Sequence, residues 1–227
     1  MALSPAYGAP RPAVRRQPQV EPGPRAQALI KRGVDVAGAV ALGVVFSPLI
    51  AFVICALKLD GGPVLFAHSR VGRNGRRFRV YKFRSMVADA QTALEELLDQ
   101  HPELREEWER DHKLRNDPRV TRLGRFLRKT SLDELPQLLN VLKGEMSLVG
   151  PRPIVDAELR RYGRAVRYYL ASKPGITGLW QVSGRSDTDY GRRVAMDRYY
   201  AENGSVLLDL SILARTVLVV LGRRGAY

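Results

Sequence analysis

The sequence predicts a mostly helical protein with one broken apolar helix near its N-terminus and one β-hairpin. Three observations lead to this fold class: an apolar stretch interrupted by a proline, an Asn-Gly pair between runs of β-branched and aromatic residues, and later segments whose apolar residues recur at helical spacing. With 227 residues and 45% hydrophobic content, the chain has enough apolar side chains for the core of one domain with an appendage.

The chain is strongly basic, with a formal net charge of +14. This excess of positive charge indicates an anionic partner. Nucleic acid, anionic lipid and a phosphorylated substrate all carry the required negative charge. The single cysteine, Cys55, excludes a disulfide framework and a cysteine metal site. The three histidines, His68, His101 and His112, lack metal-ligand spacing.

Residues 1–28 are predicted to form a disordered basic tail, because they contain six of the 14 prolines and cannot bury a core. The segment does not read as a signal peptide. About 30 residues precede the first apolar region, and no small-residue cleavage site of the usual kind follows it.

The apolar stretch Val34 to Leu57 is the membrane candidate, and Asp35 is its only charge. A straight helix of this length reaches about 36 Å and could cross a bilayer core of about 30 Å. Ser47-Pro48 in its middle predicts a sharp kink, which leaves two arms of about 15 to 20 Å. Basic residues flank both ends, which favours a re-entrant hairpin. On the residues alone, a kinked spanning helix is equally open, and a buried core helix is a third option.

A β-hairpin is predicted over residues 64–84, with Asn74-Gly75 at its turn. Basic residues, Lys82 and Arg84 among them, are interleaved with aromatic residues along its strands. This pattern suits single-stranded nucleic acid, which is bound by stacking and phosphate contacts. It equally suits a hairpin that lies on an acidic membrane surface.

Four later segments have helical patterns. Residues 87–114 predict one or two amphipathic helices without assigned chemistry, and residues 120–130 predict a basic helix. A further helix is expected over residues 165–171. Residues 206–221 are too polar to span a membrane and predict a helix packed on the domain or lying at the interface.

Two adjacent acids, Asp133 and Glu134, stand at the start of a short apolar segment. Ser131-x-x-Glu134 is a capping box, which is the commoner meaning of this spacing and accounts for Glu134. It leaves Asp133 unused, with its carboxylate pointing outward from the helix end. Several basic residues lie nearby in the sequence, which suits recognition of a phosphorylated substrate: Arg125, Arg128, Lys129 and Arg152.

Such a pair of carboxylates has a clear chemical use. One carboxylate can attack phosphorus to form an aspartyl phosphate, and the other can hold Mg²⁺ that neutralises phosphate oxygens. The sequence therefore predicts a phosphate and metal site, beside the plain alternative of a helix cap.

Long ordered motifs carry a family resemblance. TSLDELPQ, NVLKGEMS and VGPRP within residues 130–153, PVLFAHSRVGRNGRRFRVYKFRSM before them, and KPGITGLWQVSGR after them are similar to the bacterial sugar transferase family, the monotopic phosphoglycosyl transferases. The resemblance covers residues 31–227. One departure is His68, where the family more often carries glutamine.

The resemblance implies a mostly helical α/β monotopic membrane protein. It divides the chain into a tail at 1–28, a re-entrant helix-break-helix at 29–58, broken at Ser47 and Pro48, and a small cytoplasmic catalytic domain at 59–227. It also implies residue roles. Asp133 and Glu134 are catalytic, with Glu134 holding Mg²⁺, and the expected substrate-binding residues are Lys82, Arg84, Arg128, Arg152, Gln181, Arg185 and Asp197.

The implied reaction is a two-step phosphoryl exchange at the cytoplasmic face of the inner (plasma) membrane. Asp133 attacks a nucleoside diphosphate sugar, expected to be a UDP-hexose, and undecaprenyl phosphate then takes the sugar phosphate. Anionic lipids and a homodimer are further expected partners, whereas nucleic acid is not. The alternative from another class is a membrane-anchored basic module that binds nucleic acid or acidic lipid, which predicts salt-dependent binding and no need for Mg²⁺.

Overall fold

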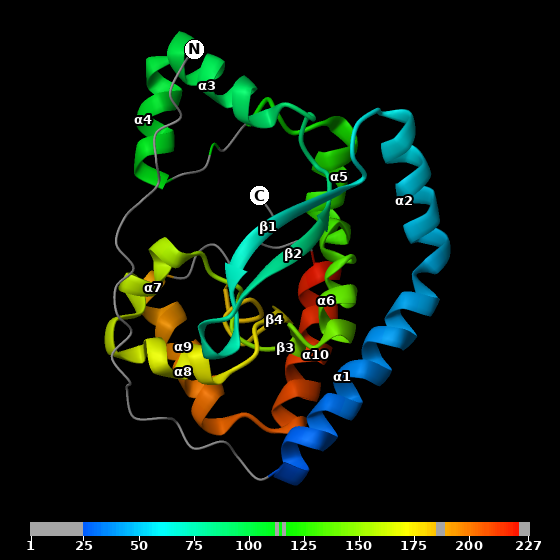
Figure 1. The fold of residues 1–227 in the computed structure, drawn as a ribbon, viewed down its shortest axis with the longest axis vertical. Helices are drawn as coiled ribbons and strands as arrows, with labels where there is room; N and C mark the ends of the chain where they lie inside the picture. The colour runs from blue at the N-terminus through cyan, green and yellow to red at the C-terminus, as the bar shows by residue number, and fades with distance from the viewer. Residues whose placement is uncertain (1–24, 112–113, 115–116, 185–188, 223–227) are drawn as a thin grey trace.

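The computed structural model describes residues 25–111, 114, 117–184 and 189–222. The role of Arg185 and most of the predicted disordered tail over residues 1–28 lie outside these described residues. The last four residues of that tail, 25–28, are helical, so the prediction of disorder was wrong for them. A bent pair of helices, α1 (Arg25–Val45) and α2 (Ser47–Leu59), runs along one side of the molecule, and the other elements gather on its concave side (Figure 1). The fold is mostly helical with two small sheets, in agreement with the predicted class.

The bend between α1 and α2 measures 63° and follows from the Ser47-Pro48 pair. Pro48 has no N–H, so it cannot donate to the carbonyl of Val44 one turn earlier. The Ser47 hydroxyl donates to that carbonyl instead, at 2.8 Å. Among the described residues no single helix is long and apolar enough to cross a membrane, whereas the bent pair meets both criteria together.

The predicted hairpin is confirmed. Strands β1 (Leu65–Val71) and β2 (Arg77–Phe83) pair antiparallel around a turn in which Asn74 adopts a left-handed backbone, with φ of 58°. The hairpin leads to α3 (Ala90–Gln100) and α4 (Pro102–Asp111), so residues 87–114 contain two helices. Next comes the basic helix α5 (Arg122–Thr130), whose residue Gly124 packs directly on the backbone of Ser85.

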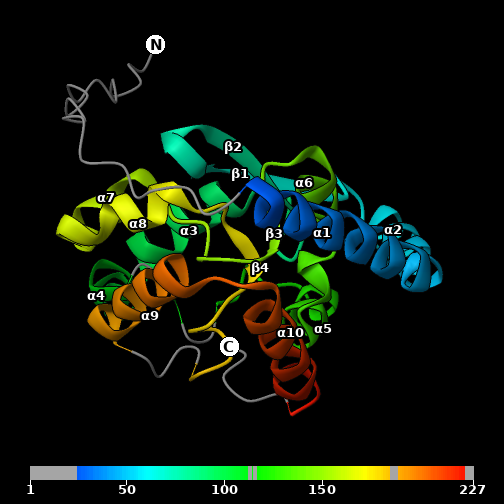
Figure 2. The ribbon, with the colours of Figure 1, turned by 90° about the horizontal axis from the view of Figure 1, so that it is seen from below.

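The largest cluster of buried apolar side chains lies around a short parallel pair of strands that had not been predicted. β3 (Ser147–Val149) pairs with β4 (Gly175–Thr177), and each strand has only three residues. Figure 2 shows this pair in the middle of the molecule, next to α1 and α10. The helices around it are α6 (Gln137–Lys143), α7 (Asp156–Tyr162), α8 (Val166–Ala171), α9 (Tyr190–Asn203) and α10 (Val206–Leu221).

Asp35, the one charge in the apolar segment, ties α1 to this core. Its carboxylate is buried and accepts hydrogen bonds from the Ser147 hydroxyl at 2.9 Å and the Leu148 amide at 3.0 Å. One turn earlier, Lys31 forms an ion pair of 2.6 Å with Asp209 of α10. A buried carboxylate is costly unless it is paired in this way, so these contacts fix how the bent pair is docked.

The capping box expected at Ser131 is absent. Ser131 has a left-handed backbone with φ of 58°, ends α5, and makes no side-chain cap. Leu132–Glu134 forms one 3₁₀ turn, and the α-helix begins later, at Gln137. The capping interpretation was wrong because Ser131 ends one helix and so cannot have the extended backbone that an N-cap requires.

Candidate active site

Asp133 is held at the wall of a large cavity by the sharp turn that separates α5 from α6. The left-handed Ser131 reverses the chain, and the 3₁₀ turn places the side chains of Asp133 and Glu134 in the cavity lining. Asp133 is not the outward-pointing carboxylate of an exposed helix end that the sequence suggested, because it is only 7% exposed. The cavity has a volume of about 820 Å³, enough for a nucleotide-sized ligand.

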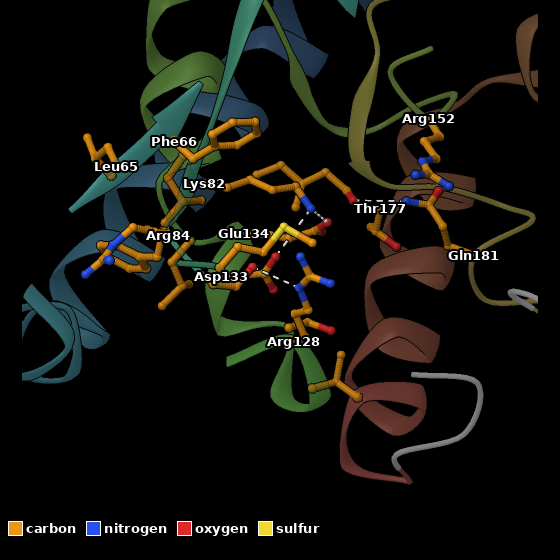
Figure 3. Close-up of a pocket in the computed structure, with 18 of the residues that line it drawn as sticks. Leu65, Phe66, Lys82, Arg84, Arg128, Asp133, Glu134, Arg152, Thr177 and Gln181 are labelled. Atoms are coloured by element: carbon orange, nitrogen blue, oxygen red, sulfur yellow. Dashed lines mark hydrogen bonds and ion pairs between the residues drawn. The ribbon is translucent and has the colours of Figure 1, made fainter. Parts of the chain in front are cut away.

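Lys82 of β2 joins the two carboxylates. Its ammonium lies 2.6 Å from Glu134 Oε1 and 3.4 Å from Asp133 Oδ2 (Figure 3). The shorter contact engages Glu134, whereas Asp133 is bound only loosely and keeps lone pairs free. Burial works against the charged form of Lys82, but Glu134 and then Asp133 outweigh it and raise the pKa of Lys82, so this residue stays cationic.

The pKa of Asp133 is determined by its buried position between charged neighbours. Burial raises the pKa of Asp133 above its ordinary value, Lys82 opposes that rise, and the neighbouring charge of Glu134 adds to it. Arg128, on the last turn of α5, is a weaker cation for the same carboxylate and donates to the Ser85 hydroxyl at 2.8 Å. Asp133 is thus a partly desolvated carboxylate, and desolvation strengthens a nucleophile.

The cavity as a whole is cationic. Five cationic side chains line it, against the two carboxylates: Lys82, Arg84, Arg119, Arg128 and Arg152. Arg119 is engaged by Asp117 at 2.6 Å, whereas no ion pair of Arg128 or Arg152 is found in the described part of the chain. The excess of positive charge suits a ligand with a diphosphate group.

Arg84 and Gln181 also line this cavity, where they had been predicted. The Arg84 guanidinium reaches back to the end of α2, donating to the carbonyls of Leu57 and Gly61 and pairing with Asp60 at 3.1 Å. Gln181 follows β4, and its amide donates to the Ile176 carbonyl at 3.0 Å.

Asp197 is the predicted site residue that the structure places apart. It is 2% exposed on α9, accepts a hydrogen bond of 2.7 Å from the Tyr162 hydroxyl, and is not among the residues that line the cavity. Burial raises the pKa of Asp197 to about 6, although Tyr162, Arg193 and Arg152 oppose the rise. The helix-surface alternative for Asp197 is excluded by this burial.

Within the described residues, no three histidine, cysteine or acidic side chains converge as a metal cage. Mg²⁺ does not require one, since it commonly binds through one or two carboxylates together with substrate phosphates and water. Asp133 and Glu134, side by side and open to the cavity, fit that mode. Mg²⁺ binding at Glu134 stays a prediction.

Sequence reasoning missed Trp180 and Thr177, which line the cavity next to Gln181. Arg152 lies over the Trp180 ring at 5.9 Å from its centroid, and Arg193 lies over it at 4.7 Å. A tryptophan in a glycine-rich loop was a usable signal, because a loop of that kind has few other large apolar side chains to bury.

The structure thus combines a carboxylate pair in a cationic cavity, whose charge suits a phosphate-bearing ligand, with a bent pair of apolar helices. The chain belongs to the bacterial sugar transferase family, whose sequence model matches residues 26–223. The resemblance seen in the motifs is therefore confirmed over nearly the whole described chain.

Individual relatives are similar over most of this chain. The undecaprenyl-phosphate galactose phosphotransferase of Salmonella typhimurium is 55% identical over 203 residues, which are 89% of this chain and 43% of that protein. The exopolysaccharide production protein ExoY of Rhizobium meliloti is 48% identical over 200 residues, 88% of both chains. The undecaprenyl-phosphate glucose phosphotransferase of Komagataeibacter xylinus is 41% identical over 88% of this chain and 37% of its own. The chain thus spans well under half of the Salmonella and Komagataeibacter relatives.

Proposed function

We propose that this protein transfers a hexose 1-phosphate from a UDP-hexose to undecaprenyl phosphate, the first membrane step in the synthesis of a polysaccharide or glycan. The family and the names of the Salmonella and Komagataeibacter relatives support the reaction class. The UDP-galactose-lipid carrier transferase of Erwinia amylovora, 53% identical over 198 residues, supports a UDP-sugar donor. The single observation that carries the proposal is Asp133, desolvated in a cationic cavity and only loosely held by Lys82.

In the first step, a carboxylate oxygen of Asp133 attacks the hexose-bearing phosphorus of the donor. The bond from that phosphorus to the bridging oxygen breaks, its electron pair leaves with UMP, and a hexose-phosphoryl aspartate remains. In the second step, an oxygen of undecaprenyl phosphate attacks the same phosphorus and displaces the Asp133 carboxylate. The product is undecaprenyl diphosphate hexose, and Asp133 is regenerated.

The cations of the cavity stabilise the charge that moves in both steps. Arg128 and Arg152 face the diphosphate from α5 and from the Pro-Arg-Pro segment, and neither is neutralised by an ion pair within the described residues. Lys82 compensates the charge of the carboxylate pair and holds Glu134 beside Asp133. Mg²⁺ at Glu134 would add a further charge on the phosphate oxygens. Fixed charges of this kind lower a phosphoryl-transfer barrier because they need no reorganisation.

The bent pair α1–α2 supports membrane attachment at the cytoplasmic face. Large apolar side chains on it are exposed to solvent, including Val44 at 67%, Val45 at 70% and Phe52 at 66%, all near the bend. A re-entrant pair with its bend in the lipid would bury these side chains and keep the catalytic cavity at headgroup depth, where both a soluble nucleotide sugar and a lipid phosphate reach it.

The test is UMP release from a panel of UDP-sugars, with Mg²⁺ and undecaprenyl phosphate, together with covalent labelling by a donor radiolabelled in its sugar. We expect wild-type protein to release UMP with one UDP-hexose and to retain the label, and Asp133→Asn to do neither. Asp156→Asn is the matched control, because Asp156 is an exposed carboxylate paired with Arg77 on the surface. Full turnover by Asp133→Asn would rule out the covalent mechanism.

A further inference from the structure

A second hollow, which we call the groove, lies on the inner side of the bend between α1 and α2. Its volume is about 700 Å³. One wall is formed by the bent pair, and the other by α6, the two residues before it and the open end of the β1–β2 hairpin. Figure 1 shows these elements on the concave side of the bent pair. The reaction proposed above leaves the groove unused.

The groove offers few hydrogen-bonding groups to a ligand. Lys58, close to the end of α2, is the one charged residue in the described part of its lining. Ser47 also belongs to the lining, but its hydroxyl already donates to the Val44 carbonyl at 2.8 Å. The other lining residues are glycine, proline and apolar side chains. A hexose or a nucleotide would leave its polar groups unpaired there, which is costly, whereas a hydrocarbon chain gains by leaving water.

The groove adjoins the catalytic cavity. Four apolar side chains belong to the lining of both: Leu65, Phe83, Leu135 and Leu138. Leu65 is 43% exposed and lies at one end of the cavity in Figure 3, so packed core does not close this end. Leu135 directly follows the carboxylate pair in the chain, so the apolar lining begins next to the proposed nucleophile. A phosphate in the cavity and a hydrocarbon chain in the groove can therefore belong to one ligand.

The groove is also open to its surroundings. Val44 on α1 is 67% exposed and Leu139 on α6 is 48% exposed, although both line the groove. Leu139 is not part of the bent pair, so insertion of that pair into lipid does not by itself account for its exposure. Because Val44 lies beside the bend, a re-entrant pair would place this opening in the lipid. A hydrocarbon chain can then enter the groove from the membrane and bury both walls.

We infer that the groove binds the isoprenoid chain of the acceptor, undecaprenyl phosphate, while the phosphate of the same molecule lies in the catalytic cavity. This inference rests on the proposed function. Of the two substrates only the acceptor carries a hydrocarbon chain, and its phosphate must reach the phosphorus bound to Asp133 in the second step. The groove thereby orients the acceptor with its phosphate toward the nucleophile.

The charge of the cavity favours the acceptor over an ordinary phospholipid as the occupant. A phosphate monoester such as undecaprenyl phosphate carries a charge of about −1.5 to −2 at neutral pH. The phosphodiester of a membrane phospholipid carries a single negative charge and has a substituent on both sides. The cations Lys82, Arg128 and Arg152 in the adjoining cavity therefore attract the acceptor more strongly.

Gly43 offers a way to fill the groove without touching the catalytic cavity. It lines the groove but not the cavity, and a Cβ atom at this position would meet no atom within 4 Å. Gly43→Leu therefore occupies space that the chain would use. Gly33→Leu is the matched control, because Gly33 lies on the same helix, also has open space at its Cβ position and is outside the groove lining. Both variants replace a helical glycine, so their effects on helix propensity are the same.

The first measurement is turnover with varied undecaprenyl phosphate, beside covalent labelling by radiolabelled donor without acceptor. Gly43→Leu should raise the KM for undecaprenyl phosphate about tenfold, because part of the chain can no longer be buried. Labelling should be unchanged, because the first step does not involve the lipid. Gly33→Leu should match wild type in both. Thermal unfolding shows whether each variant is folded, and Leu139→Gln, which places an amide in the groove, serves if Gly43→Leu is not. An unchanged KM in the folded groove variant would overturn the inference.

The second measurement identifies the occupant of the groove directly. An analogue of undecaprenyl phosphate with a diazirine in its chain is photolysed with the whole protein, and the cross-linked peptides are mapped by mass spectrometry. We expect cross-links in α1, α2 and α6, fewer of them in Gly43→Leu, and protection by excess undecaprenyl phosphate but not by phosphatidylglycerol. Equal protection by both lipids would overturn the inference in favour of an ordinary membrane lipid.

The two measurements separate failure of this inference from failure of the proposed function. Wild-type protein that releases no UMP from any UDP-hexose would overturn the proposed function, whereas photolabelling still shows whether the groove binds an isoprenyl phosphate. Wild-type protein that releases UMP but gives no cross-links in α1, α2 or α6 would overturn the inference alone.

Discussion

Asp133 and Asp197 are both buried aspartates whose pKa is raised by burial, yet their surroundings differ. Asp197 accepts a hydrogen bond of 2.7 Å from the Tyr162 hydroxyl and is not among the residues that line the cavity. Asp133 lines the cavity, with Lys82 on one side and Arg128 nearby. Burial raises the pKa of both carboxylates, but of the two only Asp133 combines burial with a place in the cavity lining and a lysine ammonium at 3.4 Å. These two features, and not burial, are why we propose Asp133 as the nucleophile.

The largest expected effect comes from exchanging the two aspartates for asparagine. Asp133→Asn should lower turnover by about 10³-fold or more, because the nucleophile is lost. Asp197→Asn should stay within about tenfold of wild type, because its carboxylate does not reach the cavity. Turnover of both variants with the preferred donor checks this, and an equal loss in the two would show that Asp197 also touches the substrate.

The next effect concerns the cation beside Asp133. Lys82→Met should lower kcat/KM about 10²- to 10³-fold, because the carboxylate pair loses its compensating charge. It should also move the acid limb of the pH profile to higher pH. Lys82 holds the pKa of Asp133 down against burial, so its removal raises that pKa further, and attack needs the ionised carboxylate. Lys143→Met, at an exposed lysine next to Tyr81, is the control and should leave the profile unchanged.

The third expected effect is a dependence of the free energy of unfolding on pH, and its source is Asp197. Its pKa rises from 3.8 to about 6 on folding, so the folded state binds the proton more tightly. The protonated Asp197 side chain therefore adds about 3 kcal/mol to the free energy of unfolding. This contribution is fully present below pH 3.8 and is lost as the pH rises through about 6. Denaturant unfolding of wild type and Asp197→Asn at several pH values tests this. A difference between the two that does not vary with pH would contradict it.

The smallest expected effect concerns Tyr162, the hydrogen-bond partner of Asp197. Tyr162→Phe removes the hydroxyl that hydrogen-bonds Asp197, which should cost about 2 kcal/mol of unfolding free energy at pH 8, where the carboxylate is ionised. Because that hydrogen bond lowers the pKa of Asp197, the loss of stability should also extend to higher pH in the variant. Covalent labelling should be unchanged. Reduced labelling in folded Tyr162→Phe would show that the two aspartates are coupled.

Much of the helical framework could be predicted from local sequence signals. The Ser47-Pro48 break, the Asn74-Gly75 turn and the helix from Val206 to Leu221 all depend on residues close in sequence, and all three are present. The parallel pair β3–β4 could not be predicted. Its two strands have three residues each and lie 25 residues apart, too short for a periodic pattern.

The sequence predicted which residues form the candidate site, but not how these residues contact one another. The motifs named Asp133, Glu134 and Lys82, whereas only the fold shows that Lys82 bridges the two acids. The capping box failed because Ser131 is shared between two elements, which spacing alone does not reveal. Asp35 was noticed only as an interruption, since its partners Ser147 and Leu148 lie more than 100 residues away.

The contacts of Lys82 and Arg84 link the carboxylate pair to the end of α2. Arg84, the first residue after β2, donates to the carbonyls of Leu57 and Gly61, and Lys82, two residues earlier and within β2, donates to Glu134. Lys82 and Arg84 are separated by only about 7 Å of extended chain, and an extended chain cannot be lengthened much further. The carboxylate pair Asp133–Glu134 is therefore held at a fixed distance from the end of α2 by a link of only two residues.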